Sequence, residues 1–408
     1  MYNPYVAGGL FCVVAHHFWD RPGGGELVMA SLAVAAERLG YTPVLTSLTK
    51  FRVERYVDWF GIDLGRYPVV AGGISLKSFG LYQRLFVWRP VKKALELYSP
   101  RLVVIDMPTY KPIVGKVPIV EYIHFPLDAT FNRRYRHLGF YYRDDPYTSE
   151  RYGKFPLNIY AAVYARLYPI YARGNPFEVA ELVLTNSRWT GEVVKALYGE
   201  EPLVLNPPLP PNLGDPGQRA SFEEREPCVV MLGRYSHEKR YHWVLERVAP
   251  LIVKEVPEVR LVIMGDASTP TSASYYQSLA SFAEFRGLKN NVTLLKNLSR
   301  GEINRVLSSC RVFLHATINE HWGIAVAEAM WHGVPVVVHK SGGAWTDLAQ
   351  LGEAGIGYKD EGEAVEALAR LLSDGKMWRH YSNKSLEKAR DLTFEKFVDR
   401  ATKLLSDL

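Results

Sequence analysis

The chain has 408 residues, of which 48% are hydrophobic and 23% charged, and its formal net charge is +6. Such a length and composition suit two globular domains with cores of their own and exclude an intrinsically disordered chain. No apolar run reaches the roughly 18 residues of a membrane-spanning helix, and the first apolar stretch lacks a signal-peptide leader, so we expect a cytoplasmic protein.

The N-terminal half begins with the pattern of a βαβ unit. An apolar run at residues 9–15 precedes a glycine-rich loop, and a helical pattern follows over residues 26–39 until Gly40 ends it. Further strands are predicted at residues 42–47, 102–105, 119–124 and 182–185.

Three glycines, Gly23, Gly24 and Gly25, form the loop that leads into this first helix. Free backbone amides at a helix start can hold phosphate, so these glycines are candidate ligand-binding residues. The G-x-G-x-x-G fingerprint of dinucleotide-binding folds is absent, and an ordinary flexible turn would have the same sequence.

Residues 131–173 carry most of the excess positive charge. They hold eight Lys and Arg against three Asp and Glu, together with nine of the 25 tyrosines. Mixed basic and aromatic side chains suit a membrane interface or a phosphate-bearing partner, but solvated helices over a tyrosine-rich core would have the same pattern. A nucleic-acid partner is not expected, since the excess is local and no binding motif accompanies it.

A proline-rich stretch, NPPLPPNLGDPG at residues 206–217, predicts a linker between two domains, because proline continues neither a helix nor a central strand. Beyond it, strands and helices alternate regularly, and Ser299 with Glu302 forms the capping box of one helix. The strands are apolar throughout, which indicates a parallel sheet buried on both faces. These strands are CVVMLG, VRLVIMG, NVTLL, RVFLHA and VPVVVH.

The predicted fold class is therefore α/β, with two Rossmann-like, doubly wound domains facing a cleft. The domains span residues 1–205 and 218–375. The remaining segment, residues 376–408, is amphipathic and is expected to be helical, with a possible return to the first domain.

The three cysteines, Cys12, Cys228 and Cys310, lie far apart inside apolar runs. This spacing favours reduced thiols in the core over a disulfide framework or a metal site. We therefore expect no disulfide, and no metal is implied.

Glu320 and Glu328 are eight residues apart, around the start of a predicted helix near Gly323. Ligands of parallel sheets collect where strands end and helices begin, because the helix start offers free amides and a favourable dipole. Gly323 would let a diphosphate approach the backbone, with amides of Ile324 and Ala325 as donors. On spacing alone, two such glutamates are usually ordinary surface charges.

The string EHWGIAVAEAM, followed by HGVPVVV and SGG, resembles the donor-binding signature of glycosyltransferase family 4, with its E-x7-E pair at Glu320 and Glu328. A second element, GRYSHEK, is similar to the family's G-R-x-x-x-x-K loop. The resemblance implies that Arg234 and Lys239 bind the donor diphosphate. It also implies that His124, at the end of a strand, contacts the donor sugar.

This resemblance implies a GT-B enzyme, a retaining hexosyltransferase that needs no metal and no cofactor besides a nucleotide sugar as co-substrate. The strings PGGGE, YIHFP, TNSRWT, NPP and SGGAWTDL are similar to the branch that moves mannose from GDP-mannose to lipid-linked oligosaccharide. A glycan or lipid-diphosphate-linked acceptor is then expected, with peripheral membrane contact through residues 131–173. The donor base is expected near Asn297 and Leu298. A nucleotide-sugar epimerase, a sugar phosphorylase and a non-catalytic nucleotide-sugar sensor stay open.

Overall fold

The computed structural model describes residues 9–73, 80–145, 148–149, 152–172, 174–215, 217 and 219–408. The chain divides into two compact units. Unit 1 comprises Met1–Asn212 and Thr393–Leu408, and unit 2 comprises Leu213–Leu392. The division after Asn212 lies inside the stretch that the sequence marks as a linker.

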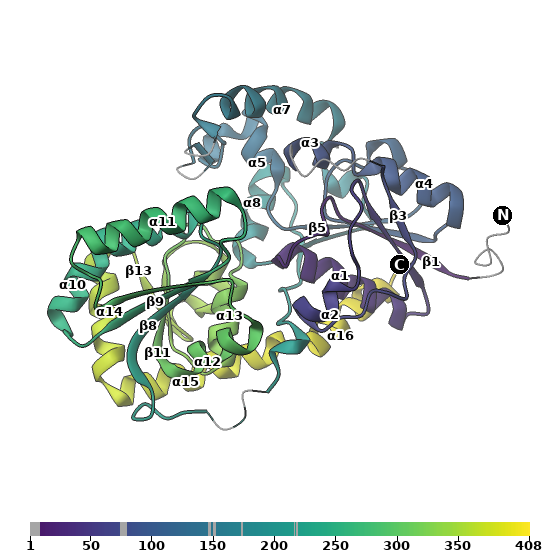
Figure 1. The fold of residues 1–408 in the computed structure, drawn as a ribbon. Helices are drawn as coiled ribbons and strands as arrows, with labels where there is room; N and C mark the ends of the chain where they lie inside the picture. The colour runs from purple at the N-terminus through teal and green to yellow at the C-terminus, as the bar shows by residue number, and fades with distance from the viewer. Residues whose placement is uncertain are drawn as a thin grey trace. The chain divides into compact units, whose positions relative to one another are not determined.

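Unit 1 is built on a seven-stranded sheet in the order β3-β2-β1-β4-β5-β6-β7, and all of its paired strands are parallel (Figure 1). Apolar side chains of β1, β2, β4 and β5 pack on one face against α3, α4, α5 and α7. The strands are β1 (Phe11–Ala15), β2 (Thr42–Ser47), β3 (Val69–Ala71), β4 (Leu102–Ile105), β5 (Ile119–Ile123), β6 (Leu182–Thr185) and β7 (Leu203–Val204).

The helices of unit 1 are α1 (Gly24–Arg38), α2 (Arg55–Phe60), α3 (Gly80–Leu85), α4 (Trp88–Tyr98), α5 (Leu127–Phe131), α7 (Leu157–Tyr171), α8 (Arg188–Tyr198) and α16 (Phe394–Ser406). Alanines fill the buried side of α1, which lets this helix pack closely on the elements around it. Short 3₁₀ turns lie at Lys111–Ile113, Arg133–Leu138, Pro176–Glu178 and Pro211–Leu213.

Unit 2 is built on a six-stranded parallel sheet in the order β10-β9-β8-β11-β12-β13. Residues of α10, α11 and α14 share one continuous core with β8, β9 and β11. The strands are β8 (Glu226–Leu232), β9 (Arg260–Gly265), β10 (Val292–Lys296), β11 (Cys310–His315), β12 (Val336–His339) and β13 (Ile356–Tyr358).

The helices of unit 2 are α9 (Tyr241–Trp243), α10 (Ala249–Glu255), α11 (Pro270–Phe285), α12 (Arg300–Ser309), α13 (Ile324–Trp331), α14 (Glu361–Ser373) and α15 (Gly375–Ala389). A π-helical turn, Val244–Val248, joins α9 to α10, and a second one spans Ala344–Leu348. Short 3₁₀ turns lie at His237–Lys239, Gln350–Gly352 and Arg390–Leu392. Ser299 and Glu302 cap α12 as predicted.

Differences from the predicted elements concern short or interrupted segments. The sequence pattern missed β3, β7 and β13, which have at most three residues each and therefore show no periodicity. The C-terminal segment, predicted as helices, forms α15 and α16, and the backbone is extended at Thr393 between them. No helix in the described ranges is both long and apolar enough to cross a membrane.

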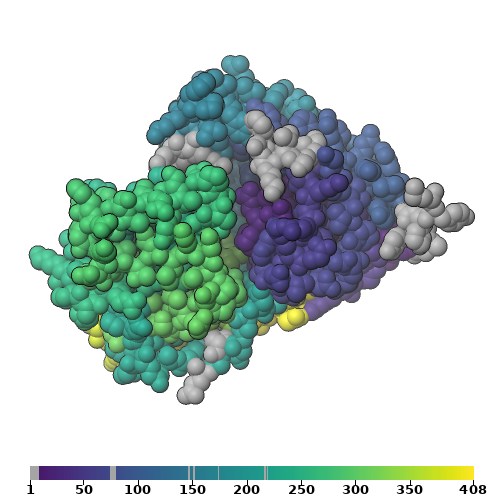
Figure 2. Space-filling model, viewed as in Figure 1, coloured from purple at the N-terminus to yellow at the C-terminus, as the bar shows by residue number. Residues whose placement is uncertain are grey.

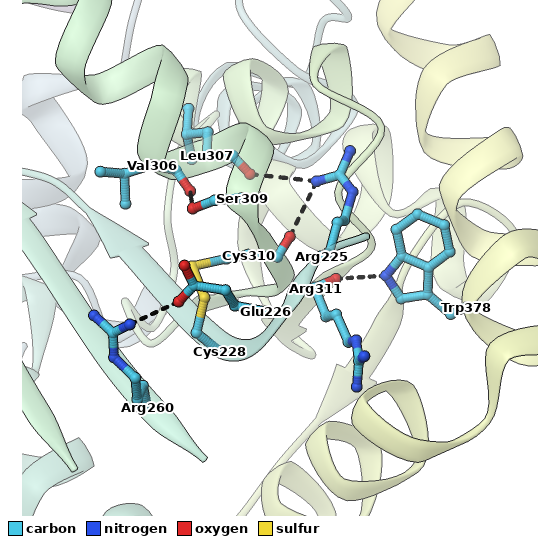
Figure 3. Close-up of a disulfide and its surroundings, with 10 residues drawn as sticks. All are labelled: Arg225, Glu226, Cys228, Arg260, Val306, Leu307, Ser309, Cys310, Arg311 and Trp378. Carbon is cyan, nitrogen blue, oxygen red and sulfur yellow. Dashed lines mark hydrogen bonds and ion pairs between the residues drawn. A yellow bond between two sulfur atoms is a disulfide. The ribbon is translucent and has the colours of Figure 1, made fainter. Parts of the chain in front are cut away.

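The prediction that all three cysteines are reduced is wrong for two of them. Cys228 of β8 and Cys310 of β11 form a disulfide, with their Cα atoms 4.9 Å apart (Figure 3). The two strands pair directly, and their register shifts between Cys310 and Val312. Far apart in sequence, these cysteines become neighbours only through the order of strands in the sheet. Cys12 is buried and free, as expected.

Candidate functional site

The predicted donor-binding residues of unit 2 gather where neighbouring strands end. Arg234 follows β8, and Glu320 lies in the loop after β11, which pairs with β8. The order of this sheet reverses between these two strands, and ligands of doubly wound sheets bind at such a point.

Glu320 is held by two cationic or polar partners. Lys239 Nζ lies 2.8 Å from Glu320 Oε2, and His315 Nε2 lies 3.0 Å from the same oxygen. Burial opposes ionisation of Glu320, but the Lys239 charge and the hydrogen bond from His315 hold its pKa well below the usual value. Burial also lowers the pKa of His315. Glu320 is therefore an ionised acceptor beside the Lys239 ammonium group.

The loop that carries Glu320 is fixed by the loop after β12. The Asn319 amide donates to Ser341 Oγ at 2.7 Å, and the Gly343 amide donates to the Glu320 carbonyl at 2.7 Å. A Cβ on Gly342 would lie 2.2 Å from that carbonyl oxygen, and Gly342 has a φ of +75°. Only glycine fits there, so the SGG string of the sequence has a structural role next to Glu320.

Gly323, with a φ of +99°, precedes α13, whose first residues are Ile324 and Ala325. The left-handed backbone is one that L side chains rarely adopt, so glycine is required for the turn into this helix. The first amides of α13 have no partner within the helix, as at any helix start, and can bind an anion.

Glu328 is buried on α13, and its Oε2 accepts a hydrogen bond from Arg300 Nη1 at 2.9 Å. Glu328 thus has a cationic partner of its own, as Glu320 has in Lys239. Arg300, the first residue of α12, is a partner that sequence reasoning missed.

Arg234 is exposed, and its Nη2 lies 3.3 Å from Glu238 Oε1. Burial works against ionisation of Glu238, but Ser236 and the Arg234 charge lower its pKa. Arg234 and Lys239 therefore lie on the same segment after β8. Arg234 is exposed to solvent, whereas Lys239 contacts Glu320.

Asn297 directly follows β10 and has a structural role. Its side-chain Oδ1 accepts a hydrogen bond from the Ala267 backbone amide at 2.8 Å. The backbone amide of Asn297 donates to the Gly265 carbonyl at 3.0 Å. These bonds leave the side-chain amide nitrogen of Asn297 for other contacts. Leu298, the next residue, is half-buried. The predicted role of these two residues at a nucleotide base stays a prediction.

In unit 1, His124 belongs to a cluster at the carboxyl ends of three adjacent strands. His16 follows β1, Asp106 follows β4 and His124 follows β5. Asp106 Oδ2 lies 2.5 Å from His16 Nδ1 and 3.2 Å from His124 Nε2, so both histidines can donate to one carboxylate oxygen. Sequence reasoning found only His124; the signal for the others is that each directly follows an apolar strand.

Charge in this cluster is strongly coupled. Burial would raise the pKa of Asp106, but the charges and hydrogen bonds of His16 and His124 lower it below the usual range. Burial opposes protonation of His16, yet Asp106 and Glu26 raise its pKa to about 10. His16 is therefore a buried cation at neutral pH.

The glycine-rich loop closes against these histidines. Gly23 precedes α1 and Gly24 begins it. A Cβ on Gly25 would lie 3.3 Å from His124 Nε2 and 3.5 Å from His16 Cε1. The first turn of α1 therefore brings backbone close to His16 and His124.

His16, His17 and Asp106 place three potential metal-ligand atoms within 4.8 Å of one another. Asp106 Oδ2 already accepts from His16 and His124, and burial lowers the pKa of His17. Asp106 Oδ2 thus belongs to a hydrogen-bonded charge network with His16 and His124.

Residues 218–388 match the family model "Glycosyl transferases group 1". A GDP-Man:Man(3)GlcNAc(2)-PP-Dol alpha-1,2-mannosyltransferase of Dictyostelium discoideum is 22% identical over 69% of this chain, and the human enzyme of that name is 25% identical over 65%. A trehalose synthase of Pyrococcus horikoshii is 26% identical over 47% of this chain and 46% of its own length. The two alignments with the mannosyltransferases each cover 56% of the relative's own length.

Solved structures show the same fold. Anabaena HepE (Alr3699), in complex with UDP and glucose, has a TM-score of 0.68 at 17% identity over 98% of this chain and 100% of its own. WaaG, a glycosyltransferase involved in lipopolysaccharide biosynthesis, has a TM-score of 0.67 at 13% identity over 97% of this chain and 99% of its own. Residues 218–388 thus resemble the group 1 glycosyl transferases, and the chain has the GT-B fold, with two Rossmann-like, doubly wound units.

Proposed function

We propose that the chain is a retaining hexosyltransferase that moves mannose from GDP-mannose to a hydroxyl of a glycan or a lipid-diphosphate-linked glycan. The observation that carries this proposal is the ionised Glu320, held by Lys239 and His315 in the segment that matches the family. The chain spans about half the length of the curated mannosyltransferases it matches, 56% of each.

Departure of a nucleoside diphosphate needs its charge neutralised, and cations with fixed amide dipoles can do this without a metal. Lys239 has three N–H donors, so it can keep Glu320 and also bind a phosphate oxygen. Arg234 and the amides of Gly323, Ile324 and Ala325 add to this neutralisation. Glu320 holds the sugar hydroxyls, and Glu328, oriented by Arg300, holds the ribose.

The departing diphosphate takes the proton of the attacking hydroxyl on the same face of the sugar, so retention needs no side-chain nucleophile. His124 is the predicted sugar contact in unit 1, where Asp106 orients its ring. Gly23, Gly24 and Gly25 are the predicted backbone contacts of this unit.

Replacement of Glu320 by Gln tests the proposal. The variant keeps the shape and loses the charge that pairs with Lys239, so kcat for mannosyl transfer should fall about 100-fold or more. Glu366→Gln, on the exposed side of α14, is the matched control. Full activity of Glu320→Gln with an unchanged circular dichroism spectrum would falsify the assignment.

The donor can be identified by thermal shift. The names of the mannosyltransferase relatives include GDP-mannose, while HepE was solved with UDP-glucose. A ligand at about 100 times its Kd stabilises the folded state by about 2.7 kcal/mol. We expect GDP-mannose to raise Tm more than UDP-glucose; the reverse order would reassign the donor.

For the acceptor, the PP-Dol of the relatives' names supports a lipid-linked substrate, and we propose peripheral contact of residues 131–173 with the cytoplasmic membrane face. Product analysis separates the alternatives. An epimerase changes the donor without any acceptor, a phosphorylase needs free phosphate, and a sensor turns nothing over. Transfer to a free sugar instead would agree with the trehalose synthase relative.

A further inference from the structure

A cavity of about 340 Å³ in unit 1 is lined by four arginines, Arg133, Arg136, Arg143 and Arg166. Its apolar and aromatic lining includes Phe131, the last residue of α5, and Tyr142. The size is at the low end of ligand pockets, which suits a small headgroup and not a whole glycan.

Positive charge in this cavity is only partly compensated. Asp144 accepts two hydrogen bonds from Arg136, each 2.7 Å long, and Arg143 Nε donates to Tyr142 Oη at 2.9 Å. For Arg133 and Arg166, no ion pair with a carboxylate is found among the described residues. Among the described residues, four arginines and no carboxylate line the cavity, and only Arg136 is paired with a carboxylate, so the remaining N–H donors suit an anion with several oxygens.

Helix α7 adds a second observation, an exposed apolar stripe. Ile159, Val163 and Ile170 are 56%, 43% and 62% exposed. Together with Arg166 they follow the spacing of one helical face, whereas Ala161, Tyr164 and Tyr168 are buried. In Figure 2, atoms of this blue-teal part of the chain form the surface at the upper edge of the view.

A helix with exposed large apolar side chains and an arginine among them is suited to lie at a bilayer surface, with its guanidinium group at headgroup level. Phe155, just before α7, is 78% exposed and extends the apolar surface. Arg166 thus belongs both to the exposed face of α7 and to the lining of the four-arginine cavity.

We propose that the four-arginine cavity binds the diphosphate of a polyprenyl-diphosphate-linked acceptor while the exposed stripe of α7 lies against the bilayer. This inference rests on the proposed function and specifies how its acceptor is held. An adjoining cavity of about 260 Å³ shares Tyr142 and Arg143 and adds Tyr152 and Asn158. Aromatic and uncharged polar groups suit the first sugar beyond the diphosphate.

The test uses the full chain and three kinds of phosphatidylcholine vesicles: plain, with a polyprenyl alcohol, and with the same polyprenyl diphosphate. Sedimentation should be strongest with the diphosphate, and soluble inorganic pyrophosphate should compete, which separates the phosphate contact from the lipid contact. Saturating nucleoside diphosphate in all samples keeps pyrophosphate out of the donor site. Arg143→Gln/Arg166→Gln should weaken diphosphate-dependent binding about tenfold or more, because two charge-assisted contacts are lost.

Arg101→Gln/Lys116→Gln is the matched control, since it removes the same charge at exposed positions before β4 and β5. In transfer assays, the cavity variant should raise KM for the diphosphate-linked acceptor and leave KM for the donor unchanged. Equal weakening in both double variants, or binding that ignores the diphosphate, would overturn the inference. If the unsubstituted chain shows no transfer at all, the proposed function itself is wrong. Failure of the inference and failure of the proposed function are therefore distinguishable.

Discussion

Two buried carboxylates of unit 1 show how neighbours decide the charge of a side chain. Asp106 follows β4 and lies between His16 and His124, which lower its pKa. Glu121 lies on the adjacent strand β5, where its Oε2 accepts a hydrogen bond from the Tyr110 hydroxyl at 2.6 Å. Burial raises the pKa of Glu121, and the hydrogen bond from Tyr110 lowers it. The effect of burial is larger, and the resulting pKa is about 8. Glu121 is therefore mostly neutral at pH 7, one strand away from an ionised aspartate.

Glu121→Gln should stabilise unit 1 at pH 8 and have little effect at pH 4.5. The unfolded chain ionises this group near pH 4.5, whereas the folded chain resists ionisation up to about pH 8. The raised folded pKa thus lowers the free energy of unfolding progressively between these pH values. Glutamine removes this penalty, worth on the order of 4 kcal/mol at pH 8.

Urea unfolding at pH 4.5 and pH 8 measures this difference. Glu96→Gln, exposed on α4, is the control and should show no pH-dependent gain. An equal gain for Glu121→Gln at both pH values would contradict a titration of Glu121.

At this scale, the sequence predicts the candidate site residues that belong to a recognisable string and misses their partners. Lys239 and Glu320 lie in contact, but His315 was read only as part of a strand. Arg300 was read as an ordinary residue of a capped helix, and it holds Glu328. A partner residue needs no fixed spacing from the group it holds, so only the sheet order and the folded geometry reveal it.

The order of strands is the element-scale feature that places both candidate sites. In each unit, the first strand of the sheet lies beside the fourth, as in the 3-2-1-4-5-6 order of doubly wound folds. This order brings His16 next to Asp106 in unit 1 and the loop of Arg234 next to that of Glu320 in unit 2. A doubly wound fold class, as predicted from the sequence, implies that the first and fourth strands of each sheet are neighbours.

The same reasoning would have found the disulfide. Cys228 lies in the first strand of its sheet and Cys310 in the fourth, so a doubly wound order makes them neighbours in spite of a separation of 82 residues. Composition and spacing alone indicate reduced thiols, because they carry no information about which strands are neighbours in the sheet.

Cys228→Ala/Cys310→Ala should lower the free energy of unfolding of unit 2 by about 2–4 kcal/mol, since the disulfide restricts a long loop of the unfolded chain. A reductant should lower Tm of the parent chain and leave that of the double variant unchanged. Cys12→Ala, a buried free thiol in unit 1, should keep the response to reductant. The same response in all three chains would contradict a role of the disulfide in stability.

At the scale of the whole molecule, unit 1 is formed by two separate segments of the chain. After α15 it leaves unit 2 at Leu392, and α16 becomes part of unit 1 again. Phe397, Val398, Ala401 and Leu405 of α16 are buried, and Thr402 Oγ1 donates to the Ala35 carbonyl of α1 at 3.5 Å. The amphipathic pattern of this segment predicts a buried face and a possible return to the first domain, and in the structure α16 lies against α1.

Arg38 of α1 forms ion pairs with Glu395 and Asp399 of α16. All three side chains are exposed, so these pairs contribute little compared with the buried apolar face. The alanines on α1 and α16 set the packing, because larger side chains would keep the two helices apart.

Ala401→Glu should therefore destabilise unit 1 and spare unit 2. Ala401 is fully buried on α16, and a charged side chain there would lose its hydration without a partner, at about 3 kcal/mol. Hydrogen exchange of the full chain should show faster exchange in β1, β2 and α1, with β8, β9 and β11 unchanged, because each unit has its own sheet and core. Ser406→Glu adds the same charge at an exposed position of α16 and should leave exchange in both units as it was. Faster exchange in both sheets of the Ala401→Glu variant would mean that the two units unfold together, and that α16 stabilises the whole chain.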